Sequence, residues 1–207
     1  MTHPVVVLDF ETTGLSPDRG DRATEIAAVV LDSGRIVDRY QSLMNAGLRI
    51  PWFIERLTGI SDAMVRGAPP ATQVMREFAT FLRDFPVVAH NVSFDRKFLV
   101  AEMGRIGVEV RQEFLCSMRV ARRIFPEAEN HKLETLQDYA RLPGTGRHHR
   151  ALADAELAAH LWQRMTDELR RRYALRSVPL ALMRDVQNLP CRGLDDAIER
   201  LRRRHGA

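Results

Sequence analysis

The chain has 207 residues, 45% of them hydrophobic, which is enough for a sizeable core and favours one domain with an appendage. No run of eighteen apolar residues is present, and the apolar run near Met1 is too short for a signal peptide, so we expect a cytoplasmic protein without a membrane span. The formal charge of +4 favours a polyanionic partner, although a GC-rich genome produces the same bias towards arginine. Cys116 and Cys191 have no metal-ligand spacing, and we expect free thiols.

Short apolar runs separated by turn signals alternate with helical patterns as far as Leu169. The β-branched run at 5–10 predicts a buried strand, and Ser33-Gly34 predicts a hairpin turn. In chain order we expect strands at 5–10, 24–31 and 36–43, helices at 51–57, 61–65 and 70–82, a strand at 86–89, a helix from Ser93 to Gly104 or Gly107, a strand at 114–116, helices at 117–125 and 133–139, and a long helix from about His149 through Leu169. This order predicts an α/β domain whose mixed sheet has antiparallel strands first and parallel strands later.

The composition changes near Arg170. From there to Ala207 the sequence has ten arginines against four acids, and Pro179 and Pro190 interrupt it. We expect a domain at 1–172 and a basic C-terminal appendage at 173–207, with a short helix at 194–201. The appendage has apolar residues that could bind a partner or could equally pack on the domain, namely Leu180, Leu182, Met183, Val186 and Leu189.

Carboxylates lie where the predicted strands end and the predicted helices begin. Asp9 and Glu11 end the first strand two residues apart, so both side chains point to the same side. Two such acids repel each other and are costly to desolvate, and a bound cation would relieve that repulsion. The alternative for Glu11 is a solvated residue at the strand end.

Asp95 and Asp154 each fall in the first turns of a predicted helix, and His149 precedes Asp154 by five residues. Each acid alone has an ordinary interpretation, because the helix dipole favours acids near a helix N-terminus. Together, four carboxylates suit two hard divalent cations, Mg²⁺ or Mn²⁺, which can serve an in-line phosphoryl displacement. An imidazole beside them could accept the proton of the attacking water.

Three segments match the motifs of one enzyme family in order and in spacing. Residues 7–15, 90–95 and 149–155 resemble the three motifs of the DEDDh, or DnaQ-like, 3′–5′ exonucleases, and the placement of His149 resembles the histidine branch of that family. The resemblance covers about residues 4–169 and is greatest to the proofreading exonucleases of bacterial replicative polymerases. It implies an α/β, ribonuclease H-like fold with a mixed five-stranded sheet flanked by helices.

The resemblance also implies a role for each matched residue. Asp9, Glu11 and Asp154 would bind two Mg²⁺ or Mn²⁺ ions directly, and Asp95 would help to hold the second ion. His149 would be the general base, and Glu11 would be a second catalytic residue besides binding metal. The residues expected to contact the substrate are Thr12, Thr13, Gly14 and Leu15, with Asn91 in a supporting role.

The implied reaction is hydrolysis of the 3′-terminal phosphodiester of single-stranded or frayed DNA, with release of nucleoside 5′-monophosphates. The Thr12-Thr13 pair resembles the DNA-proofreading members, and RNA trimming is the alternative, because oligoribonucleases tend to have methionine at the first position. Two more functions fit the sequence. One is a proofreading subunit whose C-terminal segment binds a polymerase. The other is a basic nucleic-acid binding module with a degenerate catalytic site, and the five intact catalytic positions argue against it. We expect His148, adjacent to His149, to be a solvated loop residue.

Overall fold

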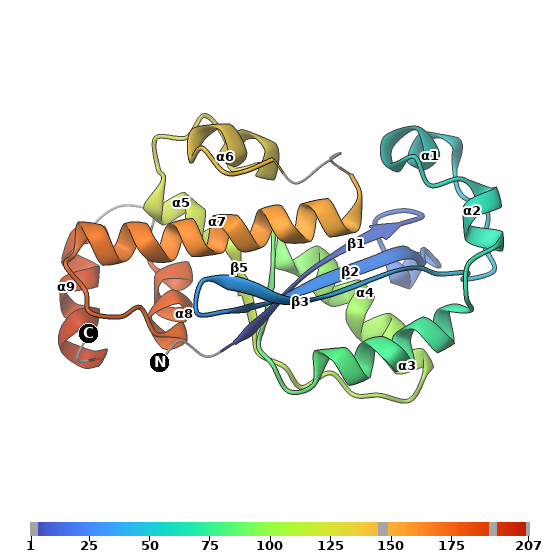
Figure 1. Ribbon diagram of the computed structural model, residues 1–207, viewed down its shortest axis with the longest axis horizontal. Coiled ribbons are helices and arrows are strands. Elements are labelled where there is room, and N and C mark those ends of the chain that lie inside the picture. Colours follow the sequence, from blue (N-terminus) through green and yellow to red (C-terminus); the bar gives the residue numbers. More distant parts are fainter. Residues whose placement is uncertain (1–3, 145–148, 191–193, 206–207) are drawn as a thin grey trace.

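Five strands and their flanking helices make up most of the residues that the computed structural model describes, which are 4–144, 149–190 and 194–205 (Figure 1). The elements in chain order are β1 Val5–Thr12, η1 Pro17–Arg19, β2 Ala23–Asp32, β3 Arg35–Leu43, α1 Trp52–Thr58, α2 Asp62–Arg66, α3 Ala71–Leu82, β4 Val87–Ala89, α4 Val92–Arg105, β5 Phe114–Cys116, α5 Ser117–Ile124, α6 Leu133–Tyr139, α7 Ala151–Arg172, α8 Leu180–Asn188 and α9 Leu194–His205. The long helix expected from about His149 through Leu169 is α7, which begins at Ala151, because Arg150 is still extended, and ends at Arg172.

The strands form one sheet in the order β3-β2-β1-β4-β5. β1 pairs antiparallel with β2, and β2 with β3, whereas β4 is parallel to both β1 and β5. The predicted mixed five-stranded sheet of ribonuclease H type is therefore confirmed. Because β1 and β4 run in the same direction, their carboxyl ends lie at the same end of the sheet. The first two acidic motifs are at this end.

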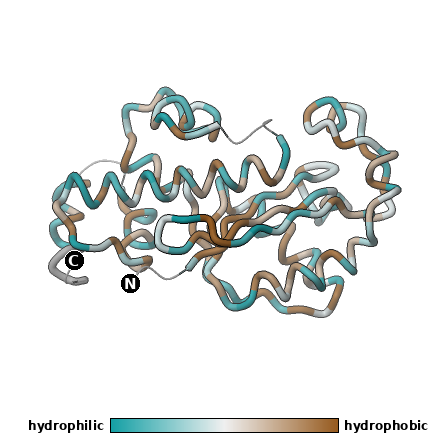
Figure 2. The backbone as a smooth tube through the Cα atoms, viewed as in Figure 1, coloured by the Kyte–Doolittle hydropathy of each residue, from teal (hydrophilic) through white to brown (hydrophobic). Residues whose placement is uncertain are grey.

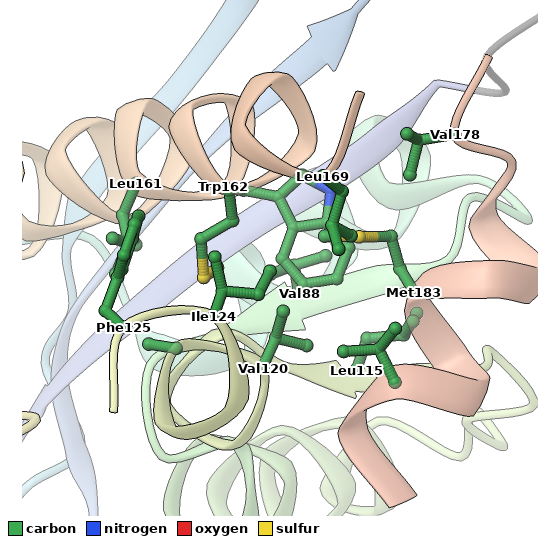
Figure 3. Close-up of a cluster of buried hydrophobic side chains, with 14 of the residues drawn as sticks. Val88, Leu115, Val120, Ile124, Phe125, Leu161, Trp162, Leu169, Val178 and Met183 are labelled. Atoms are coloured by element: carbon green, nitrogen blue, oxygen red, sulfur yellow. The ribbon is translucent and has the colours of Figure 1, made fainter. Parts of the chain in front are cut away.

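Alternate residues of β1 face opposite helical layers, as the two-residue period of a strand requires. Val5 and Val7 face the layer of α5, α6, α7 and α8, whereas Val6 and Leu8 face the layer of α3 and α4. Hydrophobic residues are concentrated on the central strands (Figure 2). Figure 3 shows the first layer, where side chains from α5, α7 and α8 cover the strands: Val88, Leu115, Val120, Ile124, Trp162, Leu169 and Met183.

The helix α8 was not predicted, and it packs against its own chain beside α5. Leu182, Met183 and Val186 are buried in the core shared with α5 and α7. The side-chain oxygen of Gln187 accepts a hydrogen bond from the Cys116 amide at 2.9 Å, so α8 also satisfies the edge of β5. These three apolar residues therefore pack on the domain, which was one of the two arrangements that the sequence left open.

Two expectations concern residues outside the described ranges, the thiol of Cys191 and the solvation of His148. Cys116 is a buried free thiol. The short helix expected at 194–201 is α9, which continues to His205. Within the described ranges, no helix combines the length and the apolar character that are needed to cross a bilayer.

Candidate catalytic and metal site

The end of β1 and the start of α7 bring three carboxylates to one side of the sheet. Asp9 and Glu11 continue the alternation of the buried valines of β1, so both face the layer of α7. Asp154 lies in the first turn of α7, which packs across β1 and β2 (Figure 1). Asp9, Asp154 and His149 line one cleft with a volume of about 480 Å³.

Asp95 joins this group from the layer of α3 and α4. It lies in the first turn of α4, is 2% exposed, and accepts a hydrogen bond from the Phe10 amide at 3.3 Å. Phe10 stands between Asp9 and Glu11, so this bond ties the start of α4 to the end of β1 that carries the acids. Asn91, just before α4, has a left-handed φ of +72°, which asparagine tolerates better than most residues, and it lines the cleft.

His149 lies just before α7 and is close to the same acids. One ring nitrogen of His149 and one carboxylate oxygen from each of Glu11 and Asp154 lie within 4.8 Å of one another. The His149 amide donates to Oδ2 of Asp154 at 2.9 Å, which supports a left-handed φ of +60° that few side chains adopt. Nε2 also lies 3.6 Å from Oε1 of Glu134 on α6. The structure therefore brings together all five residues that were expected to catalyse or to bind metal.

Burial and mutual repulsion favour the protonated forms of Asp9 and Glu11, and burial favours the protonated form of Asp95. Burial raises the pKa of Asp9 well above its ordinary value, and the charges of Asp95, Glu11 and Asp154 raise it further. Burial raises the pKa of Glu11 to about 8, with Asp154 as the next cause, and burial also raises the pKa of Asp95 to about 8. A cation between these oxygens would remove the repulsion, and a set of carboxylates suits Mg²⁺ or Mn²⁺. The residues present therefore fit the divalent ions that the sequence led us to expect.

Glu25 on β2 is a fifth buried acid beside the site, and its role was not predicted. It is the register partner of Glu11 and is fully buried. Burial alone would raise the pKa of Glu25, but hydrogen bonds from Arg150, Gln41 and the Ala151 amide hold it below its ordinary value. Arg150 donates to both carboxylate oxygens, at 2.9 and 3.1 Å. The residue that leads into α7 is therefore anchored to β2.

The loop after β1 carries the residues that were expected to contact the 3′-terminal nucleotide. The hydroxyls of Thr12 and Thr13 are buried and engaged within the loop: Thr12 donates to the Gly14 carbonyl at 2.6 Å, and Thr13 accepts from a backbone amide at 3.0 Å. A side chain on Gly14 would collide with the carboxylate of Asp21, so any other residue there would have to displace that carboxylate. Leu15, in contrast, is 78% exposed. What the loop offers a ligand is therefore its backbone and the side chain of Leu15.

The cleft also contains a positive charge that was not predicted as part of the site. Lys132, just before α6, is exposed and lines the cleft together with Asn91 and Met118. His90 belongs to the cleft wall, with Nδ1 2.9 Å from the Ser117 hydroxyl and Nε2 2.9 Å from a backbone carbonyl. Burial lowers the pKa of His90 to about 4, so this ring is neutral and has a structural role. Lys132 is consequently the one lysine or arginine among the described residues that line the cleft.

Comparison with known proteins connects this site to one enzyme family. The family model for exonucleases of the RNase T type matches residues 6–162. The 3′-5′ exonuclease DinG of Bacillus subtilis is 38% identical over 170 residues, which cover 80% of this chain and 18% of that protein. The PolC-type DNA polymerase III of Caldanaerobacter subterraneus is 35% identical over 164 residues, which cover 79% of this chain and 12% of the polymerase. The chain thus spans less than a fifth of the length of either relative.

Solved structures share the same arrangement. Exonuclease X in complex with 5′ overhanging duplex DNA matches with a TM-score of 0.68 and 27% identity, over 88% of this chain and 99% of that one. Escherichia coli Exonuclease I in complex with a dT13 oligonucleotide matches with a TM-score of 0.71 over 84% of this chain and 43% of that one, and at 16% identity it supports the fold alone. The family match extends from β1 into α7 and includes all three acidic motifs. The chain therefore belongs to the RNase T/DEDDh family of 3′–5′ exonucleases.

Proposed function

We propose that the chain hydrolyses the 3′-terminal phosphodiester of single-stranded or frayed DNA with the help of divalent metal ions and releases nucleoside 5′-monophosphates. The observation that carries this proposal is the convergence of the four acids beside His149, at a cleft of about 480 Å³ that Asp9 and Asp154 line. A protein that only bound nucleic acid would gain nothing from clustered carboxylates, because they repel phosphates. Membership of the exonuclease family supports the same assignment.

In this proposal the acids hold two divalent ions. Asp9, Glu11 and Asp154 bind them directly, and Asp95 helps to hold the second ion. Such a pair of ions stabilises the charge that develops on the attacking and leaving oxygens of an in-line displacement. The chain itself fixes the oxygens in place, since β1 sets Asp9 and Glu11 on one side and the hydrogen bond from Phe10 to Asp95 holds α4 against them.

His149 accepts the proton of the attacking water. Its ring is close enough to Glu11 and Asp154 for one nitrogen to lie within 4.8 Å of their carboxylate oxygens. The hydrogen bond from the His149 amide to Asp154 fixes the backbone of His149 relative to the first turn of α7. Glu134, 3.6 Å from Nε2, supplies a negative charge beside the ring once the ring carries the proton.

The loop after β1 and the cleft provide the contacts with the substrate. The exposed side chain of Leu15 and the backbone from Thr12 to Gly14 contact the 3′-terminal nucleotide. Asn91 and Lys132 line the cleft, where the ammonium of Lys132 meets a phosphate oxygen. These contacts do not involve the hydrogen-bonding edges of the bases, so we expect little sequence preference. The DNA polymerase relative and the duplex bound to Exonuclease X favour DNA over RNA.

A side-by-side digestion tests this function. The substrates are 5′-labelled single-stranded DNA, duplex DNA with a mismatched 3′ end, and RNA of the same sequence, each with Mg²⁺ and with EDTA. We expect both DNA substrates to shorten from the 3′ end in Mg²⁺ alone, and Asp154→Asn protein from the same purification controls for contaminating nucleases. DNA that stays full length in Mg²⁺, or cleavage that EDTA does not affect, contradicts the proposal. Faster digestion of the RNA assigns the chain to RNA trimming instead.

Proofreading beside a polymerase is a second proposal, and one comparison favours it. The segment similar to this chain in the PolC-type relative is 12% of a DNA polymerase. Leu182, Met183 and Val186 are buried in this chain, so a polymerase would bind through another surface. Co-purification of the chain with a polymerase from its own cells, together with faster removal of a mismatched than of a matched 3′ nucleotide, tests this role. Absence of both contradicts it.

A further inference from the structure

A second groove lies beside the loop that follows β1, on the solvent face of α4. The inward face of α4 carries Asp95, Phe98 and Leu99, which are buried. The opposite face carries residues at spacings of three and four, as one side of a helix requires. With η1 this face encloses about 560 Å³, lined by Pro17, Asp18, Ser93, Arg96, Lys97, Val100 and Ala101.

The groove is basic. Arg96 and Lys97 are both exposed, and neither has a carboxylate partner within the ranges that the structure describes. The Arg96 guanidinium lies 5.3 Å from the centre of the Phe114 ring, which supports its long side chain without neutralising the charge. Asp18 is the acid in the lining, and the adjacent Arg19 is exposed and offsets it. Two uncompensated cations therefore remain for a polyanion.

The groove adjoins the proposed catalytic cleft. Asn91 lines the cleft and Ser93 lines the groove, and the Ser93 hydroxyl donates to Oδ1 of Asn91 at 3.3 Å. The other wall is the loop after β1, which leads from the acids of the cleft to Pro17 in η1 at the groove. A buried ion pair fixes this wall, because Arg22 at the loop end donates to Glu102 of α4 at 2.7 and 2.8 Å.

We propose that this groove binds the phosphates of the complementary strand when the 3′ end belongs to a duplex. This inference rests on the proposed function, in which the cut strand occupies the cleft. The two strands of B-form DNA run side by side across a minor groove about 6 Å wide, so a strand held in the cleft brings its partner to the adjoining surface. Arg96 and Lys97 then neutralise one phosphate each, while a single strand leaves them unused.

The test compares the binding of two DNA substrates. The double variant Arg96→Gln/Lys97→Gln is titrated by fluorescence anisotropy, in EDTA to prevent cleavage, against single-stranded DNA and against a duplex with a recessed 3′ end. We expect about tenfold weaker binding of the duplex, a change of less than about twofold for the single strand, and a salt slope for the duplex that is lower by about 2. Arg96→Lys/Lys97→Arg, which keeps both charges, should retain most of the duplex affinity.

The matched control removes two exposed arginines at the other end of the molecule, Arg35→Gln/Arg176→Gln, and should affect both substrates little. Equal losses for single strand and duplex would mean that the groove binds the cut strand itself, and this overturns the proposal. An unchanged affinity for the duplex also overturns it. Because this assay measures binding without metal, its outcome is separate from whether the wild-type protein cleaves single-stranded DNA in Mg²⁺.

Discussion

Glu11 and Glu25 are direct neighbours on antiparallel strands, and both belong to the acidic end of the sheet, yet their surroundings differ. Burial raises the pKa of Glu11 to about 8, and Asp154 adds to the shift. Burial acts on Glu25 too, but hydrogen bonds from Arg150 and two further donors hold its pKa below the ordinary value. Burial alone therefore does not mark a catalytic acid. What distinguishes Glu11 is that the negative charges around it outweigh the positive charge of Arg150.

The same contrast recurs along α4. Asp95 and Glu102 are two turns apart and equally buried, at 2% and 1% exposure. Arg22 donates twice to Glu102, whereas burial raises the pKa of Asp95 to about 8. The chain thus pairs the acids that hold its framework together with arginines, whereas Asp9, Glu11 and Asp95 beside the cleft carry raised pKa values.

Removing an acid of the cleft should produce the largest effect of all on activity. Asp154→Asn keeps the shape of the side chain but removes one of the charges that we propose to bind metal, and ions of this kind contribute several kcal/mol to transition-state stabilisation. We expect kcat on single-stranded DNA to fall about 10³-fold. Asp167→Asn on the same helix removes an acid far from the cleft and should change kcat less than about twofold. A variant at Asp154 that keeps more than a tenth of the wild-type rate contradicts the comparison.

Removing a compensated acid should instead cost stability. Glu25→Gln leaves Arg150, whose side chain is 34% exposed, without its buried carboxylate partner, and we expect this to cost about 2 kcal/mol in the free energy of unfolding. Because the folded pKa of Glu25 is lowered, this contribution is present above about pH 4.5 and is lost as the pH falls through the folded pKa. Urea unfolding at pH 7 and pH 3 measures it.

The matched control for Glu25 is the surface ion pair between Glu156 on α7 and Arg39 on β3. Glu156→Gln breaks the ion pair with Arg39, whose side chain is 53% exposed, and should cost less than about 1 kcal/mol. If Glu25→Gln costs no more than Glu156→Gln at pH 7, the Glu25–Arg150 pair is not an anchor of α7.

Neutralising Glu11 should stabilise the metal-free protein, the reverse of the effect at Glu25. The folded pKa of Glu11, about 8, lies above its unfolded value, so the contribution of this one group to stability is fully present below about pH 4.5 and is lost as the pH rises through about 8. Discounted for partial exposure, Glu11→Gln should be more stable than wild type by about 1–2 kcal/mol at pH 8 in EDTA, and equal at pH 4. Thermal unfolding at both pH values measures this, and a variant that is less stable at pH 8 would refute it.

Most of the fold follows from local pattern. The β-branched run of β1 and the hairpin signal at Ser33-Gly34 predict the central strands, and the spacing of apolar residues predicts α3 to α7. The helix α8 was not predicted because prolines flank it and arginines surround it. Its apolar residues therefore fitted a binding surface for a partner as well as a buried face. Its true environment depends on α5, more than fifty residues earlier, and no local pattern encodes that.

The acids of the site could be predicted because each lies at a strand end or a helix start, positions that the sheet brings to one edge. Glu25 could not be assigned, since its partner Arg150 is 125 residues away and an acid within an apolar strand was the only signal. The left-handed backbone of His149 and the position of Lys132 in the cleft likewise depend on contacts between distant segments.

Isothermal titration of the metal-free protein with Mn²⁺ at pH 7, repeated in two buffers with different ionisation enthalpies, tests the central claim most directly. Acids with raised pKa values hold protons at pH 7, and they must release these protons when a cation binds. We predict saturable binding of two Mn²⁺ ions with net release of protons, and loss of binding in Asp9→Asn. Absence of saturable binding, or binding without proton release, would contradict the account of an acidic site that binds cations in exchange for protons.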